Sequence, residues 1–175
     1  MEKYLLCYNL IAKKEKNVNM KYKEIDIRNS DELTFGQYIK LKTIISQEDK
    51  EIEIIEKIIL CLYNKKPTRE DYKDISFINY INKIVDDMVY WVKQENKALS
   101  YTPSIEEREA GIEELGESVG SFSIVKSLAK EYSKDPDDIL NWSWKKVFYI
   151  LLTDKKEFDY KEKLNKILER KYKVK

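Results

Sequence analysis

Histidine is absent from all 175 residues of the chain. Its absence excludes the commonest general base, every catalytic triad that contains histidine and every metal site built on imidazole. Cysteine is nearly absent as well: Cys7 and Cys61 stand in apolar surroundings and form no CxxC pair. We therefore expect two buried free thiols in a reducing compartment, and no zinc site.

Glycine and proline are scarce, with four and three residues. So few chain breakers favour long helices over a β fold with many turns. No stretch approaches the roughly 20 apolar residues of a membrane helix. The apolar residues 4–11 are too few for a secretory signal and lack a small-residue cleavage site. We expect a soluble chain that is made inside the cell and does not bind membranes.

Motifs that bind nucleotides or activate a nucleophile are also missing, including GxGxxG, GxxxxGK[ST] and GxSxG. The sequence GESVG at residues 116–120 lacks the lysine of a phosphate loop. Two adjacent carboxylate pairs remain, Asp86–Asp87 and Asp137–Asp138. Neighbours on a helix point about 100° apart, so neither pair converges on one atom. We expect no enzyme activity, no cofactor, no metal and no small-molecule ligand, with Asp86 and Asp87 on the polar flank of a helix.

The charge is balanced overall, at a net +1, but is unevenly distributed. Residues 104–117 hold six glutamates against one arginine, and residues 155–175 hold nine lysines and arginines against four acidic residues. Both stretches can be solvated helix faces, or they can steer copies of the chain together. On the second interpretation the contact residues are Glu106, Glu107, Glu113, Lys161, Lys163 and Arg170.

Apolar periodicity predicts a mainly α-helical fold, a bundle of four to five helices with an extended C-terminal helix and at most a small N-terminal β-hairpin. The hairpin would pair residues 4–11 with the alternating residues 18–27. Thr34 and Gln37 fit a capping box, Ser46 and Ser76 begin the next helices, and Thr153-Asp154 can break the last one. We divide the chain into a β-like segment (1–30), a helical core (31–100), an acidic arm or linker (101–120) and a C-terminal helical segment (121–175).

Residues 135–152, DPDDILNWSWKKVFYILL, join a helix start to a dense apolar run. Asp135 suits the N-cap, Pro136 the first helical position, and Ser143 a second cap. Trp142 and Trp144 lie two positions apart and so face nearly opposite ways on a helix. Either both are buried, or one is core and the other anchors an interface. If exposed, Trp144 and Phe148 would form the apolar centre of a contact.

Two segments resemble bacteriophage morphogenesis proteins. Residues 31–45, DELTFGQYIKLKTII, are similar to the start of the first helix in small phage morphogenesis proteins. Residues 128–152, LAKEY followed by DPDDILNWSWKKVFYILL, resemble the ending of tail assembly chaperones and related neck or tail proteins. The resemblance implies a protein without enzyme activity that acts through protein–protein contact.

We therefore expect a multi-copy ring or connector subunit of the virion neck or tail, whose partners are other copies of itself and other phage structural proteins. It would be made in the host cytoplasm and retained in the virion. Two alternatives stay open. One is a transient tail assembly chaperone; the other is a nucleic-acid-binding adaptor that uses the basic residues 155–175.

Overall fold

The computed structural model describes residues 22–28, 31–47 and 49–173. Over these ranges the chain is mainly helical and contains no strand, which confirms the expected fold class. The elements in chain order are α1 (Phe35–Ser46), α2 (Glu51–Tyr63), the 3₁₀ turn η2 (Asp71–Lys73), α3 (Ile75–Leu99), α4 (Ile105–Glu109), α5 (Ile112–Tyr132), α6 (Pro136–Leu140) and α7 (Trp144–Lys173).

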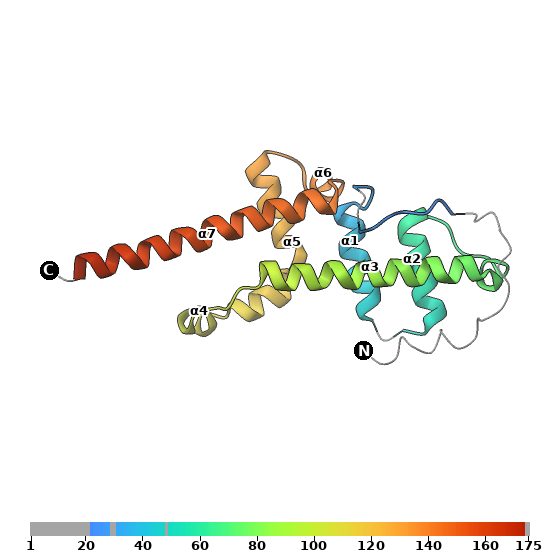
Figure 1. The fold of residues 1–175 in the computed structure, drawn as a ribbon, viewed down its shortest axis with the longest axis horizontal. Helices are drawn as coiled ribbons and strands as arrows, with labels where there is room; N and C mark the ends of the chain where they lie inside the picture. The colour runs from blue at the N-terminus through green and yellow to red at the C-terminus, as the bar shows by residue number, and fades with distance from the viewer. Residues whose placement is uncertain (1–21, 29–30, 48, 174–175) are drawn as a thin grey trace.

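The two longest helices, α3 and α7, set the shape of the molecule (Figure 1). Helices α1 and α2 form an antiparallel pair, and α3 crosses this pair. The first turns of α7 pack on α1 and α3, and the rest of α7 extends well past the other helices. The centre of the core therefore lies where α1, α3 and the start of α7 meet, and buried residues of α2, α5 and α6 extend it.

The start of α1 is held against the start of α7. Thr34 and Gln37 form the predicted capping box, in which the Gln37 amide N–H bonds Thr34 Oγ1 at 3.2 Å. The same turn makes an isolated antiparallel bridge between Thr34 and Ser143. Its backbone hydrogen bonds run from Phe35 N to Trp142 O at 2.7 Å and from Trp144 N to Leu33 O at 2.8 Å. The two segments that carry the phage resemblance thus meet in space, although they lie far apart in the chain.

Gly36 lets α6 approach α1 closely. A Cβ atom at this position would lie 3.3 Å from the carbonyl oxygen of Leu140, closer than Cβ atoms in proteins usually come to a neighbouring atom. The glycine of the TFGQ sequence therefore has a packing role.

Aromatic rings fill the centre of the core. The Trp144 ring stacks on the Tyr38 ring with centroids 3.7 Å apart and lies within 6.2 Å of the rings of Phe35, Trp91 and Phe148. Trp144 is 1% exposed. These rings join α1, α3 and α7 into one packed unit.

The predicted N-terminal β-hairpin is not found in the described residues. Residues 4–11 lie outside them, and residues 22–27 form irregular chain without a ladder partner. This segment is nevertheless well anchored: Tyr22 and Ile27 are buried, and the Trp91 indole N–H donates to the Ile27 carbonyl at 2.9 Å. Its alternating apolar residues insert between helices and do not pair with a second strand.

Several predicted helix boundaries need correction. Ser46 is the last residue of α1, where its hydroxyl donates to the Thr43 carbonyl, and Lys50 occupies the N-cap of α2. Asp74, two residues before Ser76, caps α3 by accepting from the Ser76 amide at 2.9 Å. The Ser143 prediction is confirmed, because its hydroxyl accepts from the Lys146 amide at 3.2 Å.

Helix α7 runs without the predicted break at Thr153-Asp154. The Thr153 hydroxyl donates to the Tyr149 carbonyl one turn earlier, at 2.9 Å. Its side chain is therefore satisfied inside the helix and caps nothing.

Residues 101–120, predicted as an acidic arm or linker, form the loop after α3, the short helix α4 and the first turns of α5. Ser104 and Glu107 make a capping box at the start of α4. Gly120 has φ 43° and ψ −135° and kinks α5. Most of this stretch is therefore helical and not an extended linker.

Asp87 does not lie on a solvated flank as predicted. It is 5% exposed, and its carboxylate forms an ion pair with Arg28, with 3.0 Å between Asp87 Oδ1 and Arg28 Nη2. The Arg28 guanidinium also lies 4.6 Å from the centre of the Tyr90 ring. Burial raises the pKa of Asp87 above its ordinary value, while the Arg28 charge opposes that rise.

Candidate protein-contact surface

Helix α7 divides into a packed part and a free part. Trp144, Val147 and Phe148 are buried against α1 and α3. From residue 156 onward the side chains are exposed, apart from the half-buried Asp159. We call residues 156–172 the α7 arm. In Figure 1 its outer half extends beyond every other labelled helix.

The α7 arm carries large apolar side chains in the open. Ile167 is 59% exposed and Tyr172 71%, and Tyr160, Leu164 and Leu168 are exposed as well. At about 100° per residue these five side chains spread over about 140° of the helix, and their centre lies about 150° round from the buried face of Trp144, Val147 and Phe148. Tyr172 is at the edge of this spread, within about 20° of the direction of Val147. We call this set, Tyr160, Leu164, Ile167, Leu168 and Tyr172, the arm stripe. Because the centre of the stripe, at Tyr160, Leu164 and Ile167, points away from the core side of α7, these side chains do not continue the intramolecular packing.

The base of the α7 arm is braced by the loop after α3. The Tyr101 ring meets the Phe158 ring edge-on at 6.4 Å, and Lys155 Nζ lies 5.7 Å from the Tyr101 ring centre. Phe158 therefore lies on the core side of the helix and is not a member of the arm stripe. This contact fixes the direction in which the arm leaves the core.

Charge changes along the arm. Residues 154–162 hold four acidic residues and three lysines, a sum of −1, and residues 163–173 hold five basic residues and Glu169, a sum of +4. Its ion pairs join residues one turn apart, Lys155 with Asp159, Lys161 with Glu157 and Lys166 with Glu162. Exposed pairs of this kind contribute little to stability. The outer half of the arm is thus a basic amphipathic helix.

The predicted charged contact residues are only partly accessible. Lys161, Lys163 and Arg170 are exposed on the arm, and Glu106 is exposed on α4. Glu107 is half-buried and is occupied by the capping box and by the Tyr101 hydroxyl, whose hydrogen bond lowers the pKa of Glu107. Glu113 lies in the first turn of α5, and its side chain is outside the described set. No ion pair joins α4 to α7 within residues 49–173, so the structure does not bring the acidic and basic groups together by salt bridges.

Trp144 and Phe148 are buried, so they do not form the exposed apolar centre of a contact that the sequence left open. Trp142 is the more accessible tryptophan: its ring meets Tyr132 edge-on at 5.1 Å, and Lys146 Nζ lies 3.6 Å from its centre. The expectation that the two tryptophans face opposite ways assumed that both lie on one helix, whereas Trp142 lies in the turn between α6 and α7.

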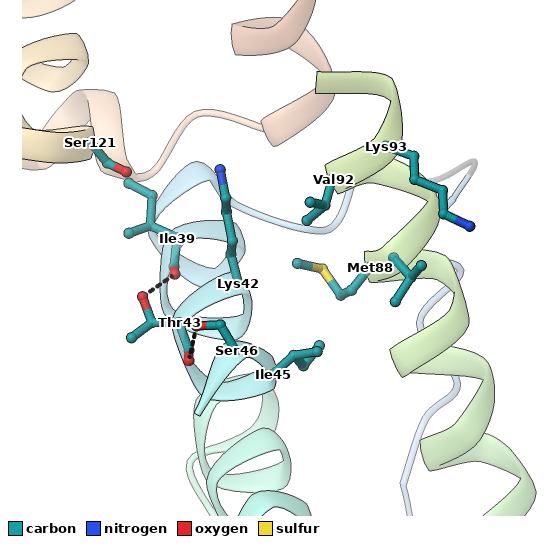
Figure 2. A pocket seen from close by; sticks show the side chains of 10 residues that line it. Ile39, Lys42, Thr43, Ile45, Ser46, Met88, Val92, Lys93 and Ser121 are labelled. Carbon is teal, nitrogen blue, oxygen red and sulfur yellow. Dashed lines mark hydrogen bonds between the residues drawn. The ribbon is translucent and has the colours of Figure 1, made fainter. Parts of the chain in front are cut away.

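A second surface is a groove of about 470 Å³ between α1 and α3. Figure 2 shows Met88 and Val92 of α3 opposite Ile39 and Ile45 of α1, with Ser121 of α5 at one end. No sequence pattern points to this groove, because its walls come from helices distant in the chain. Most of its lining surface is apolar, with Lys42 and Lys93 also among the lining residues, so it suits an apolar segment better than a charged ligand.

A polar network includes Lys42, one of the residues that line the groove. Glu95 accepts from the Tyr38 hydroxyl at 2.6 Å and from Lys42 Nζ at 2.7 Å. Burial, followed by the hydrogen bond to Glu95, raises the pKa of Tyr38, which stays neutral across the physiological range. The carboxylate is therefore held by two donors and links α1 to α3.

The thiol predicted to be buried at Cys61 is free and half-buried, and its partial burial raises its pKa. Cys7 lies outside the described residues. Within the described ranges, no three or more Cys, Asp or Glu side chains gather where a metal ion could bind, and no helix is both long and apolar enough to cross a membrane. No family model, no curated protein and no solved structure matches the chain.

Proposed function

We propose that the chain is a bacteriophage morphogenesis protein without enzyme activity, used in several copies as a ring or connector subunit of the virion neck or tail. It acts by protein–protein contact through the α7 arm. The observation that carries the proposal is the arm stripe: five large apolar side chains on a helix that leaves the core. Contiguous exposed apolar surface of this kind marks an interaction site.

The energetics of the arm support this role. A single helix in water is marginal at this length unless an apolar face is buried. The α7 arm has no such burial within its own chain beyond residue 160, so a partner that covers the stripe would stabilise both the helix and the contact. The lysines and arginines around the stripe keep the unbound arm soluble and would form the polar rim of an interface.

The phage assignment rests on the resemblance of residues 31–45 and 128–152. These segments contact each other, since the capping box at Thr34 and the helix start at Ser143 form one structural unit. The absence of enzyme activity rests on the sequence, which has no histidine and no nucleotide-binding loop.

A transient tail assembly chaperone is the second candidate, and the groove between α1 and α3 favours it. The half-buried Ile45, Val89 and Val92 offer an apolar wall against which a helix of another tail protein could lie. In this case the chain would act in the host cytoplasm and would not remain in the particle.

Purified particles of the phage that encodes the chain test the proposal. We expect mass spectrometry to find the chain in the virion in several copies, and electron microscopy to place it in a closed ring at the neck or tail. Leu164→Glu should lower the yield of complete particles. Lys166→Gln, which changes the charge equally on the opposite face of the arm, should not.

Two outcomes contradict the ring proposal. If the chain is absent from particles and is bound to another tail protein in infected cells, the chaperone is correct. If particles of normal number and shape form without the chain, it is not a morphogenesis protein.

A further inference from the structure

We infer that the arm stripe binds the arm stripe of a second copy of this chain, with the two α7 arms antiparallel. The inference rests on the proposed function, since it names the partner of the same surface. It follows from where the stripe points, from its register and from the charge along the arm.

The direction of the stripe leaves room for a second helix. The centre of the stripe lies about 150° round α7 from the face that packs on α1 and α3. Tyr101 braces the arm from the core side, at Phe158 and Lys155. A second arm can therefore lie along the stripe without meeting the core or the loop after α3.

The register of the stripe is self-complementary about Leu164. Positions 157, 160, 164, 168 and 171 recur at steps of three and four, as in the seam of a helix pair. In an antiparallel pair centred on Leu164, Tyr160 of one arm faces Leu168 of the other. At the two ends Glu157 faces Lys171, so opposite charges close each end of the seam.

The charge gradient favours the antiparallel arrangement over the parallel one. Residues 163–173 sum to +4 and residues 154–162 to −1. A parallel pair would place the two +4 halves side by side, whereas an antiparallel pair places each of them against the −1 half of its partner. Like charges opposed across an interface select against the parallel alternative.

The stripe is also large enough for a specific contact. Tyr160 and Tyr172 each offer aromatic surface of about 150–250 Å² when fully buried. Complete burial of these and of the three aliphatic side chains on both arms would remove at most about 1,000 Å² from water, the size at which weak specific interfaces begin. A two-fold contact closes after two copies, so the building unit of the proposed ring would be a dimer.

Sedimentation equilibrium of the full chain, from about 1 to about 100 μM, tests the pairing. We expect a monomer–dimer equilibrium in this range. Leu164→Glu should weaken dimerisation about a hundredfold, because the residue occurs twice in the interface and each buried leucine accounts for at least about a tenfold change. Lys166→Gln carries the same change of charge on the opposite face and should leave the dissociation constant within about twofold.

Cysteine cross-linking tests the direction of the pair in a background with Cys7→Ser and Cys61→Ala. Leu164→Cys should form a disulfide-linked dimer. Lys171→Cys alone should form no intermolecular disulfide on oxidation, and Glu157→Cys with Lys171→Cys should cross-link. A dimer from Lys171→Cys alone would mean parallel arms and would overturn the inference.

A chain that stays monomeric throughout the range, or a dimer that Leu164→Glu leaves intact, also refutes the pairing. Binding of the monomer to anionic vesicles or to single-stranded DNA through the stripe would identify a different occupant and refutes it too. The two proposals can fail separately. A monomeric chain found in virions would refute the pairing and leave the proposed function standing. A dimeric chain absent from virions would refute the proposed function and leave the pairing standing.

Discussion

The burial of Trp144 gives a sharp prediction, because Trp142 lies two residues away as a natural control. Trp144 is 1% exposed and contacts four other rings, with Tyr38 stacked at 3.7 Å. Trp142 is half-buried and meets one ring edge-on. Truncating a fully buried tryptophan costs about 3–5 kcal/mol. For a domain whose folding free energy is about 5–15 kcal/mol, Trp144→Ala should remove a large part of the stability.

The control has a smaller expected cost. Trp142→Ala loses the burial of about half a ring, the edge contact with Tyr132 and the Lys146 ammonium over the ring, together about 2–3 kcal/mol. Trp144→Phe should also be mild, at about 1–2 kcal/mol. Trp144 Nε1 is buried and, among the described residues, has no hydrogen-bond partner, so its removal relieves a desolvation cost that offsets part of the lost volume.

Equilibrium unfolding in urea, followed by far-UV circular dichroism, measures these free energies without relying on tryptophan fluorescence. The Leu164→Glu background keeps dimer dissociation out of the comparison. Equal losses for Trp142→Ala and Trp144→Ala, or a loss below about 1 kcal/mol at Trp144, would refute the aromatic core described above.

Three further predictions concern polar and backbone features. Arg28→Met should cost about 1–3 kcal/mol at neutral pH, because it leaves the buried Asp87 carboxylate unpaired. Burial already raises the pKa of Asp87 above 3.8, so the free energy of unfolding should fall as pH rises through the folded-state pKa. Urea titrations over that pH range should show a steeper fall in the variant than in the original chain. Glu95→Ala should cost about 1–3 kcal/mol in the same assay, because it leaves the buried Tyr38 hydroxyl without its acceptor. Gly120→Ala should lower the thermal unfolding midpoint, although helix propensity alone predicts a rise, because φ of 43° is strained for alanine.

The features that sequence reasoning predicted well are local. Thr34 and Gln37 are three residues apart, so their capping box depends on no distant contact, and the same holds for Ser143 at the start of α7. Ser46 failed as a cap because any residue with extended backbone can precede a helix, and Lys50 does so here. A capping residue is a preference, and the connecting chain decides where the helix begins.

The features that could not be predicted depend on contacts between distant segments. The burial of Asp87 requires Arg28, which comes from a different part of the chain. Trp144 faces the core because its backbone N–H donates to the Leu33 carbonyl, and this hydrogen bond sets the rotation of the first turn of α7. The extended C-terminal helix was expected from the sequence, but only the packing of Trp144, Val147 and Phe148 shows that the centre of the arm stripe faces away from the core.

Hydrogen exchange of the α7 arm tests the central claim, that the arm is a contact surface, most directly. An arm without tertiary contacts should open often, so its amides should exchange quickly in a dilute solution of the chain. We predict that exchange over residues 160–172 slows several-fold or more as the concentration rises through the dimerisation range. The amides near Trp144 should stay unchanged, because they are already buried in the core. Exchange in the arm that does not depend on concentration, measured on the same chain, would contradict the account.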